Sequence, residues 1–186
     1  MHIRLAKTYE RSRLHLSEGK MVSGKLRYFL KAKDAKTLLT DASKRLGFNL
    51  EQILEKKANV EVIEVDRAEI YLLNGKSALA KVGEKIFPTL VFTEYLNVAP
   101  KVVVDMGAIP HVCNGADVMA PGIKRFIGEF KSGDFVLVVD EKYGKPLAVG
   151  EALFDKSEAT KIRQGKVVKN VHFVGDKVWG IIKAES

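Results

Sequence analysis

The part of the sequence after Pro100 consists of short apolar runs separated by glycine-containing turns, and this pattern limits the folds open to it. The segments typical of helices are short, at about residues 107–113 and in the turn or two that Ser157 would cap. Five or more short strands with small helical inserts in about 80 residues predict a compact barrel. The predicted strands cover residues 102–104, 117–119, 135–139, 147–153, 171–174 and 178–182.

The first half of the chain predicts a mixture of helices and strands. Residues 25–30 have the pattern of a strand, and Asp34 is placed to cap the helix that follows. Gly47 is expected to end that helix, and Asn49 to cap a second, shorter one. The apolar stripe of the first helix is formed by Ala35, Leu38, Leu39, Ala42 and Leu46.

Three further strands are predicted at residues 60–65, 68–73 and 77–82. Asn74-Gly75 lies between the last two, and Asn-Gly between apolar runs is the strongest short signal of a hairpin. Pro88 is expected to open a short helix over residues 89–96, with a linker behind it. We therefore predict an α+β chain with one domain over residues 1–97 and a second over 98–186. Residues 1–21 of the first domain form a basic extension that is not assigned, with a strand as one conformation open to it.

The charge of the chain is concentrated at its N-terminal end. The formal net charge is +8, and residues 1–57 hold 14 Lys and Arg against 6 Asp and Glu, while the remainder is balanced. A basic region of this kind attracts phosphate backbones, which points to RNA, DNA or an anionic surface as partner; a solvated lysine face is the alternative. The candidate basic surface comprises Lys25, Arg27, Lys31, Lys33, Lys36, Lys44 and Arg45.

Several classes of chemistry have no support in the sequence. Cys113 is the only cysteine, which excludes an intrachain disulfide, and a short helix would point it away from His111, so a small buried cysteine is expected. Phosphate-loop and dinucleotide fingerprints are missing, and no carboxylate has a partner suited to acid–base catalysis. We expect no enzyme activity, cofactor or metal. Without a long apolar run or signal peptide, we expect a cytoplasmic protein with no membrane contact.

Three glycines lie close together in the second half, in Gly107-Ala108, Gly115-Ala116 and Pro121-Gly122. Glycine lets a ligand approach the main chain without a Cβ in the way. The cluster therefore predicts a surface on which another polymer lies against backbone, with three ordinary turn glycines as the alternative.

Glycine-containing segments at residues 104–109, 115–123, 133–134 and 148–150 are followed by a closing segment at 171–179. With these segments, residues 101–180 resemble a PUA domain, the pseudobarrel named for pseudouridine synthases and archaeosine transglycosylases. The first half resembles the pre-PUA domain of the malignant T-cell amplified sequence family of translation factors, which is also similar to the N-terminal part of the ligatin-type initiation factor. A composition rich in lysine, with only two glutamines, favours a thermophile. The resemblance is to an archaeal-like member of the family. The resemblance is carried by residues 69–75, 87–90, 104–109, 115–123, 133–134, 148–150 and 171–179.

The resemblance implies a pre-PUA α/β domain followed by a PUA pseudobarrel that binds RNA without catalysis. It further implies that the PUA surface holds the CCA end of tRNA and that the pre-PUA domain meets ribosomal RNA of the small subunit. Lys124 and Arg125 would contact a phosphate or lie in a solvated turn, and His111 would stack on a base, bind a phosphate or have no role. The candidate RNA-binding residues are Gly107, Ala108, His111, Asn114, Gly115, Ala116, Asp117, Met119, Pro121, Gly122, Lys124 and Arg125.

Two alternatives stay open from the sequence. The eukaryotic relatives work with density-regulated protein or a fused equivalent, so a partner here would be a separate polypeptide unless none is needed. The second function considered is an accessory RNA-docking subunit for a tRNA or rRNA modification enzyme of the archaeosine transglycosylase or pseudouridine synthase type.

Overall fold

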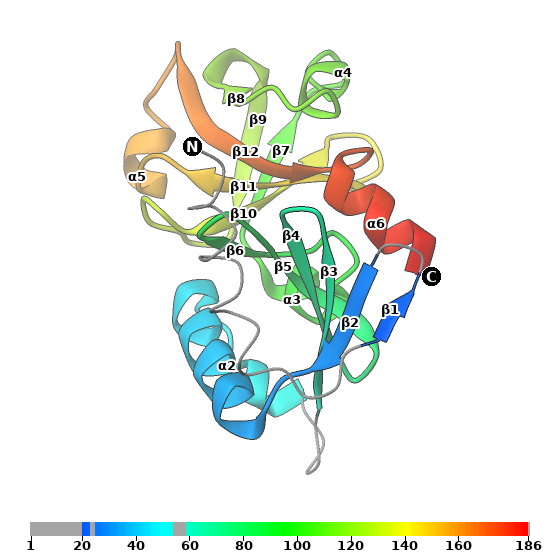
Figure 1. Ribbon diagram of the computed structural model, residues 1–186. Coiled ribbons are helices and arrows are strands. Elements are labelled where there is room, and N and C mark those ends of the chain that lie inside the picture. The colour runs from blue at the N-terminus through cyan, green and yellow to red at the C-terminus, as the bar shows by residue number, and fades with distance from the viewer. Residues whose placement is uncertain (1–19, 23–24, 54–58, 186) are drawn as a thin grey trace, which may run out of the picture.

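Two six-stranded sheets form the framework of the computed structural model, which describes residues 20–22, 25–53 and 59–185 (Figure 1). The first is antiparallel throughout, and its strands follow one another in chain order. Its strands are β1 (Lys20–Val22), β2 (Lys25–Phe29), β3 (Val60–Val65), β4 (Ala68–Leu73), β5 (Lys76–Val82) and β6 (Lys85–Pro88). The predicted extension lies outside the described residues except where it reaches β1.

The hairpin between β4 and β5 confirms the turn predicted at Asn74-Gly75. Both residues have positive φ, 51° and 77°, as a tight hairpin turn requires. The predicted start of a helix at Pro88 is wrong, because this residue ends β6 and pairs with Leu79. Proline is compatible with that position since β6 is an edge strand. Helix α3 (Thr93–Val98) begins five residues later.

Helix α2 (Ala32–Leu46) covers one side of the first sheet (Figure 1). It buries Ala35, Leu39 and Ala42, and it ends at Gly47 in the left-handed conformation, as predicted. Asp34 does not cap it: this residue lies in the first turn, where its charge favours the helix dipole. Asn49 does cap the next element, the 3₁₀ helix η2 (Leu50–Ile53), since its Oδ1 accepts the backbone N–H of Glu51 at 3.0 Å.

The second sheet is mixed and curled, with strand order β8-β12-β11-β10-β7-β9 and a parallel pairing between β7 and β10 (Figure 1). Strand β9 was not predicted because the exposed Lys124 and Arg125 interrupt its apolar pattern. The cap predicted at Ser157 is wrong, because Asp155 precedes that helix. The elements are β7 (Lys101–Val104), α4 (Ile109–Val112), β8 (Val118–Met119), η3 (Ala120–Gly122), β9 (Ile123–Ile127), β10 (Phe135–Asp140), β11 (Pro146–Ala152), α5 (Lys156–Ala159) and β12 (Lys166–Phe173).

The C-terminal element is a helix, α6 (Lys177–Glu185), so the strand predicted over residues 178–182 is wrong. Asp176 begins it by accepting the backbone N–H of Trp179 at 2.7 Å. Val178, Ile181 and Ile182 are buried, a spacing that suits a helix although all three are β-branched. Trp179 is half-buried against the same core.

The two sheets share one apolar core. A single cluster of buried side chains includes Leu79 of the first sheet, Val103 and Phe135 of the second, and Ile182 of α6. An ion pair between Lys85 and Glu151 also joins β6 to β11. A second apolar cluster fills the interior of the curled sheet. None of the described helices has both the length and the apolar character needed to cross a membrane.

Candidate nucleic-acid interface

A groove of about 460 Å³ lies between α4 and the β8–η3 segment. Its lining includes three residues outside the candidate set, Asp105, Val112 and Val118. Of these, only Asp105 has a sequence signal, because it lies just before Gly107-Ala108, the first step of the glycine cluster. Eight of the twelve candidate RNA-binding residues line the groove: Gly107, Ala108, His111, Ala116, Asp117, Met119, Pro121 and Gly122.

The three glycines have different surroundings. Gly115 has φ +85°, and a Cβ on it would lie 2.9 Å from the ring of Phe173. Glycine is therefore required at this position by both the backbone conformation and the packing of Phe173. Gly122 packs one wall of the groove against the other, because its Cβ would approach that of Ala108 to 3.2 Å. Gly107 has no neighbour as close, and its backbone lines the groove.

Asn170 on β12 fixes the far end of α4. Its side-chain amide donates to the carbonyl oxygens of Val112 and Ala116, both at 3.0 Å. Its backbone N–H donates to Asp117 Oδ1 at 2.7 Å. No pattern in the sequence marks Asn170, since its partners lie more than fifty residues away along the chain.

Asp117 lines the groove as a carboxylate that the protein itself neutralises. Lys166 Nζ lies 2.5 Å from its Oδ2. Burial on its own raises the pKa of Asp117, but the Lys166 ammonium and the Asn170 N–H outweigh that effect and hold the pKa below its usual value. We therefore assign Asp117 to holding the groove together.

His111 and Met119 are exposed on opposite walls of the groove. His111 is the only aromatic side chain among the lining residues. Cys113, predicted to be buried, is half-buried against the core of the curled sheet, and burial raises the pKa of its thiol. Across the described ranges, no three His, Cys, Asp or Glu side chains are grouped as metal ligands.

Lys124 and Arg125 lie outside the groove. They line a second hollow, of about 470 Å³, together with Lys156 and Arg163. Pro121 lines both spaces, so the short η3 helix is the wall between them. Asn114 is exposed at the end of α4 and lines neither.

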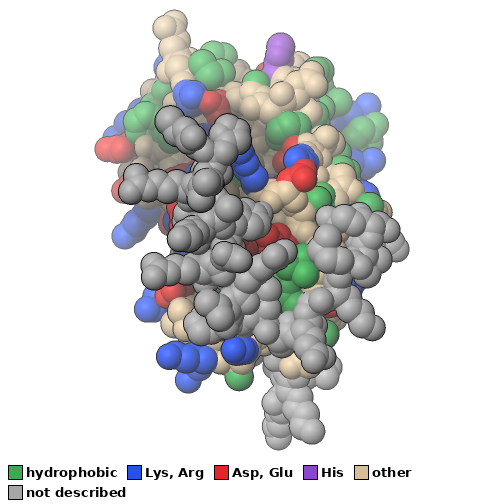
Figure 2. Space-filling view, viewed as in Figure 1, with side chains coloured by type: hydrophobic (Ala, Val, Ile, Leu, Met, Phe, Trp, Pro, Cys, Tyr) green, Lys and Arg blue, Asp and Glu red, His purple; other side chains and the backbone are tan. Residues whose placement is uncertain are grey.

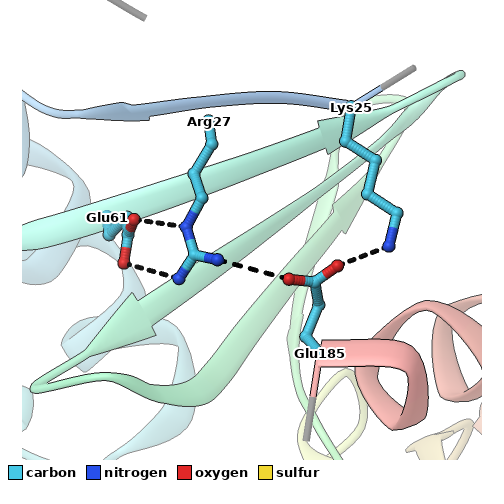
Figure 3. Close-up of polar contacts among 4 residues, drawn as sticks. All are labelled: Lys25, Arg27, Glu61 and Glu185. Atoms are coloured by element: carbon cyan, nitrogen blue, oxygen red, sulfur yellow. Dashed lines mark hydrogen bonds and ion pairs between the residues drawn. The ribbon is translucent and has the colours of Figure 1, made fainter. Parts of the chain in front are cut away.

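The candidate basic surface of the first half divides into two parts. Lys25 and Arg27 are paired with carboxylates, as Figure 3 shows. Arg27 Nε and Nη2 donate to Glu61 at 2.5 and 3.1 Å, and Nη1 donates to Glu185 of α6 at 3.3 Å. The Glu61 hydrogen bonds raise the pKa of Arg27. These two cations fasten α6 to the first sheet.

The other part lies on and beside α2. Arg45 stacks over the ring of Phe135 at 5.1 Å, which joins α2 to the second sheet. Figure 2 shows Lys and Arg side chains gathered over the region of α2. Within the described residues no carboxylate pairs with the exposed cations that remain, which are Lys31, Lys33, Lys36 and Lys44.

Comparison with known proteins assigns both halves. The model of the PUA domain matches residues 100–174, and that of a domain of unknown function matches residues 26–96. Malignant T-cell-amplified sequence 1 of Danio rerio is 30% identical over 155 residues, covering 79% of this chain and 84% of that protein. The chain belongs to the malignant T-cell-amplified sequence family. The resemblance found in the sequence is confirmed, as is the α+β fold.

Two archaeal proteins have a higher sequence identity to this chain, and a third has a similar fold. An uncharacterized protein of Methanocaldococcus jannaschii is 42% identical over 154 residues, which cover 82% of this chain and 94% of that one. The structure of a hypothetical protein from Pyrococcus horikoshii has a TM-score of 0.70 and 39% identity, covering 84% of this chain and 99% of that one. A PUA-domain structure from Aeropyrum pernix, a tartrate complex, has a TM-score of 0.73 and 25% identity, covering 91% and 98%.

Proposed function

We propose that this protein is a non-catalytic RNA-binding factor of translation that holds the unpaired CCA end of tRNA in the groove between α4 and η3. The basic surface of α2 contacts ribosomal RNA of the small subunit in the cytoplasm. The observation that supports this proposal is the convergence of eight candidate residues, from two segments of the chain, on one groove.

The groove suits unstacked bases better than phosphates. Its volume falls within the range of small-ligand pockets, about 300–1,000 Å³, and its lining is mostly apolar side chains and glycine backbone. Its carboxylates are already engaged, since Asp105 Oδ1 accepts the Ala108 N–H at 2.8 Å and Asp117 pairs with Lys166. Sequence-specific proteins read RNA at single-stranded ends, where bases can be splayed out.

The link to translation rests on the relatives. Translation machinery-associated protein 20 of Saccharomyces cerevisiae is 25% identical over 138 residues, which cover 70% of this chain and 76% of that protein. Exposed lysines without carboxylate partners on α2 supply attraction to a phosphate backbone that does not depend on base sequence. A partner that is a separate polypeptide, unless none is needed, stays a prediction.

The test compares Met119→Glu with Met106→Glu. Both side chains are about equally exposed, at 48% and 45%, but only Met119 lines the groove. We expect Met119→Glu to weaken binding to intact tRNA about tenfold or more, because a charge would enter the base site, and Met106→Glu to have a small effect. Affinity is measured at fixed salt for tRNA with and without its CCA end.

Equal affinity for the two tRNAs would overturn the 3′-end assignment. Stable isolation of the protein with an RNA-modification enzyme, without ribosomes, would favour the accessory-subunit alternative. Substitution of Gly115 is unsuitable for this test, since its Cβ would displace Phe173 and disturb the fold.

A further inference from the structure

The hollow on the far side of η3 carries four cations and no carboxylate among its lining residues. Lys124 and Arg125 come from β9, and Lys156 and Arg163 come from α5 and the turn behind it. Phe126 and Ile162 are half-buried there and supply an apolar floor. A concave space with apolar and cationic walls is suited to a phosphate-bearing group.

The charges of the hollow are only slightly compensated by the protein. Lys156 Nζ lies 2.6 Å from Glu129, whose side chain is 86% exposed. Arg163 uses one N–H to donate to the Thr160 carbonyl at 3.0 Å, which orients its guanidinium and leaves further donors. Lys124, Arg125 and Arg163 have no carboxylate partner in the part of the chain that the structure describes.

The groove and the hollow are complementary neighbours. The groove contains no Lys or Arg in its lining, whereas the hollow contains no Asp or Glu, and Pro121 is common to both. A single-stranded RNA carries apolar base faces and one negative charge per linkage. When its bases lie in the groove, the phosphates of the same strand need cations nearby, and the hollow beyond η3 supplies them.

We infer that the hollow is a second RNA subsite, which binds a backbone phosphate of the single strand whose 3′ end occupies the groove. Lys124 and Arg163 bind that phosphate from two sides, with Arg125 and Lys156 adding attraction, and the attached nucleotide packs on Phe126 and Ile162. This inference rests on the proposed function for the occupant of the groove. It adds Lys156 and Arg163, which the sequence did not single out.

The first test uses a fluorescent single-stranded RNA of eight nucleotides that ends in CCA. We expect Lys124→Gln/Arg163→Gln to weaken binding at least tenfold and to lower the slope of log affinity against log salt by about 0.7, because one phosphate is no longer neutralised. The matched control is Lys142→Gln/Lys145→Gln, which removes the same charge from exposed residues that line neither space. Equal reductions in affinity for the two variants would overturn the subsite.

The second test replaces one phosphate of that RNA at a time by an uncharged methylphosphonate. In the wild type, one linkage near the 3′ end should show a drop in affinity that is absent in Lys124→Gln/Arg163→Gln, since the two changes remove the same interaction. Additive effects at every linkage would refute the inference. Removing the terminal adenosine tests the groove separately, so the subsite and the 3′-end assignment can fail independently.

Discussion

Gly115, which lies between the two segments that line the groove, is constrained by both backbone conformation and packing. It combines φ +85° with the ring of Phe173 at 2.9 Å from its missing Cβ. Gly144 has a comparable φ of +64° but nothing within 4 Å of a Cβ. The two positions therefore separate backbone strain from steric overlap.

We expect Gly115→Ala to lower the free energy of unfolding by about 3 kcal/mol, from left-handed strain together with overpacking against Phe173. Gly144→Ala should cost about 1 kcal/mol from strain alone. Urea denaturation of both variants measures the difference. Equal costs at the two positions would show that Phe173 yields without penalty.

Asp176 makes stability depend on pH at the start of α6. Burial alone would raise its pKa, but the hydrogen bond to His172 at 2.8 Å and the backbone N–H groups of Trp179 and Phe173 outweigh it, so the pKa is lowered. A carboxylate with a lowered pKa stabilises the fold above its unfolded pKa of about 3.9, and that contribution is lost as pH falls through the folded value.

We therefore expect Asp176→Asn to be less stable than the wild type at pH 7, with the difference shrinking as pH falls below about 4. The free energy of unfolding is measured from pH 7 to pH 2 at constant salt. Asp41→Asn, an exposed change on α2, is the control and should alter stability little. A difference between Asp176→Asn and wild type that is constant across this range would contradict the assignment.

Among the elements, α2 combines two roles on two faces. Ala35, Leu39 and Ala42 pack on the sheet, and the lysines face solvent. We expect Lys33→Gln/Lys36→Gln/Lys44→Gln to weaken binding to structured ribosomal RNA and to lower the slope of log affinity against log salt by about 0.9 for each phosphate that these lysines neutralise. Affinity is measured between about 50 and 200 mM salt, a range in which neutralised phosphates make affinity fall steeply.

The control for α2 removes three exposed lysines from turns of the second half of the chain. Because none of these lysines belongs to α2, their removal should change the slope for ribosomal RNA less. A change as large as that of the α2 variant would show that net charge alone, and no surface on α2, attracts the RNA. The control residues are Lys131, Lys142 and Lys145.

At the scale of the whole molecule, α6 and the shared core tie the two sheets together. Lys177 of α6 pairs with Asp66 at 2.6 Å, and Tyr95 donates a hydrogen bond to the Phe135 carbonyl at 3.3 Å. The boundary proposed at residue 97 lies between two regions that share a core, and α6, from beyond it, packs against β4. The division into two domains at this boundary stays a proposal.

We expect the two sheets to unfold in one cooperative transition, because neither can separate without exposing the common core. Fluorescence of Trp179, the only tryptophan, reports on α6, and far-UV circular dichroism reports on all secondary structure. The two denaturation curves should coincide. Separate midpoints would mean that the sheets unfold independently.

Local signals in the sequence determined most of the first sheet and the outline of the second. The Asn74-Gly75 turn, the left-handed Gly47 and the apolar run of β3 depend on residues close together in the sequence, so local sequence is enough to predict them. The cluster of Gly107, Gly115 and Gly122 likewise indicated the region of the groove, because glycine is found where the backbone must adopt a special conformation or be approached closely.

Only the tertiary structure decided how the remaining residues are used. Helix α6 replaced a predicted strand because burial on the first sheet, not the propensity of its β-branched residues, fixes its conformation. Arg27 has its charge paired by Glu185, far along the chain, and Asn170 holds α4 across more than fifty residues. Local sequence does not predict such interactions, because their partners come together only when both sheets pack on a common core.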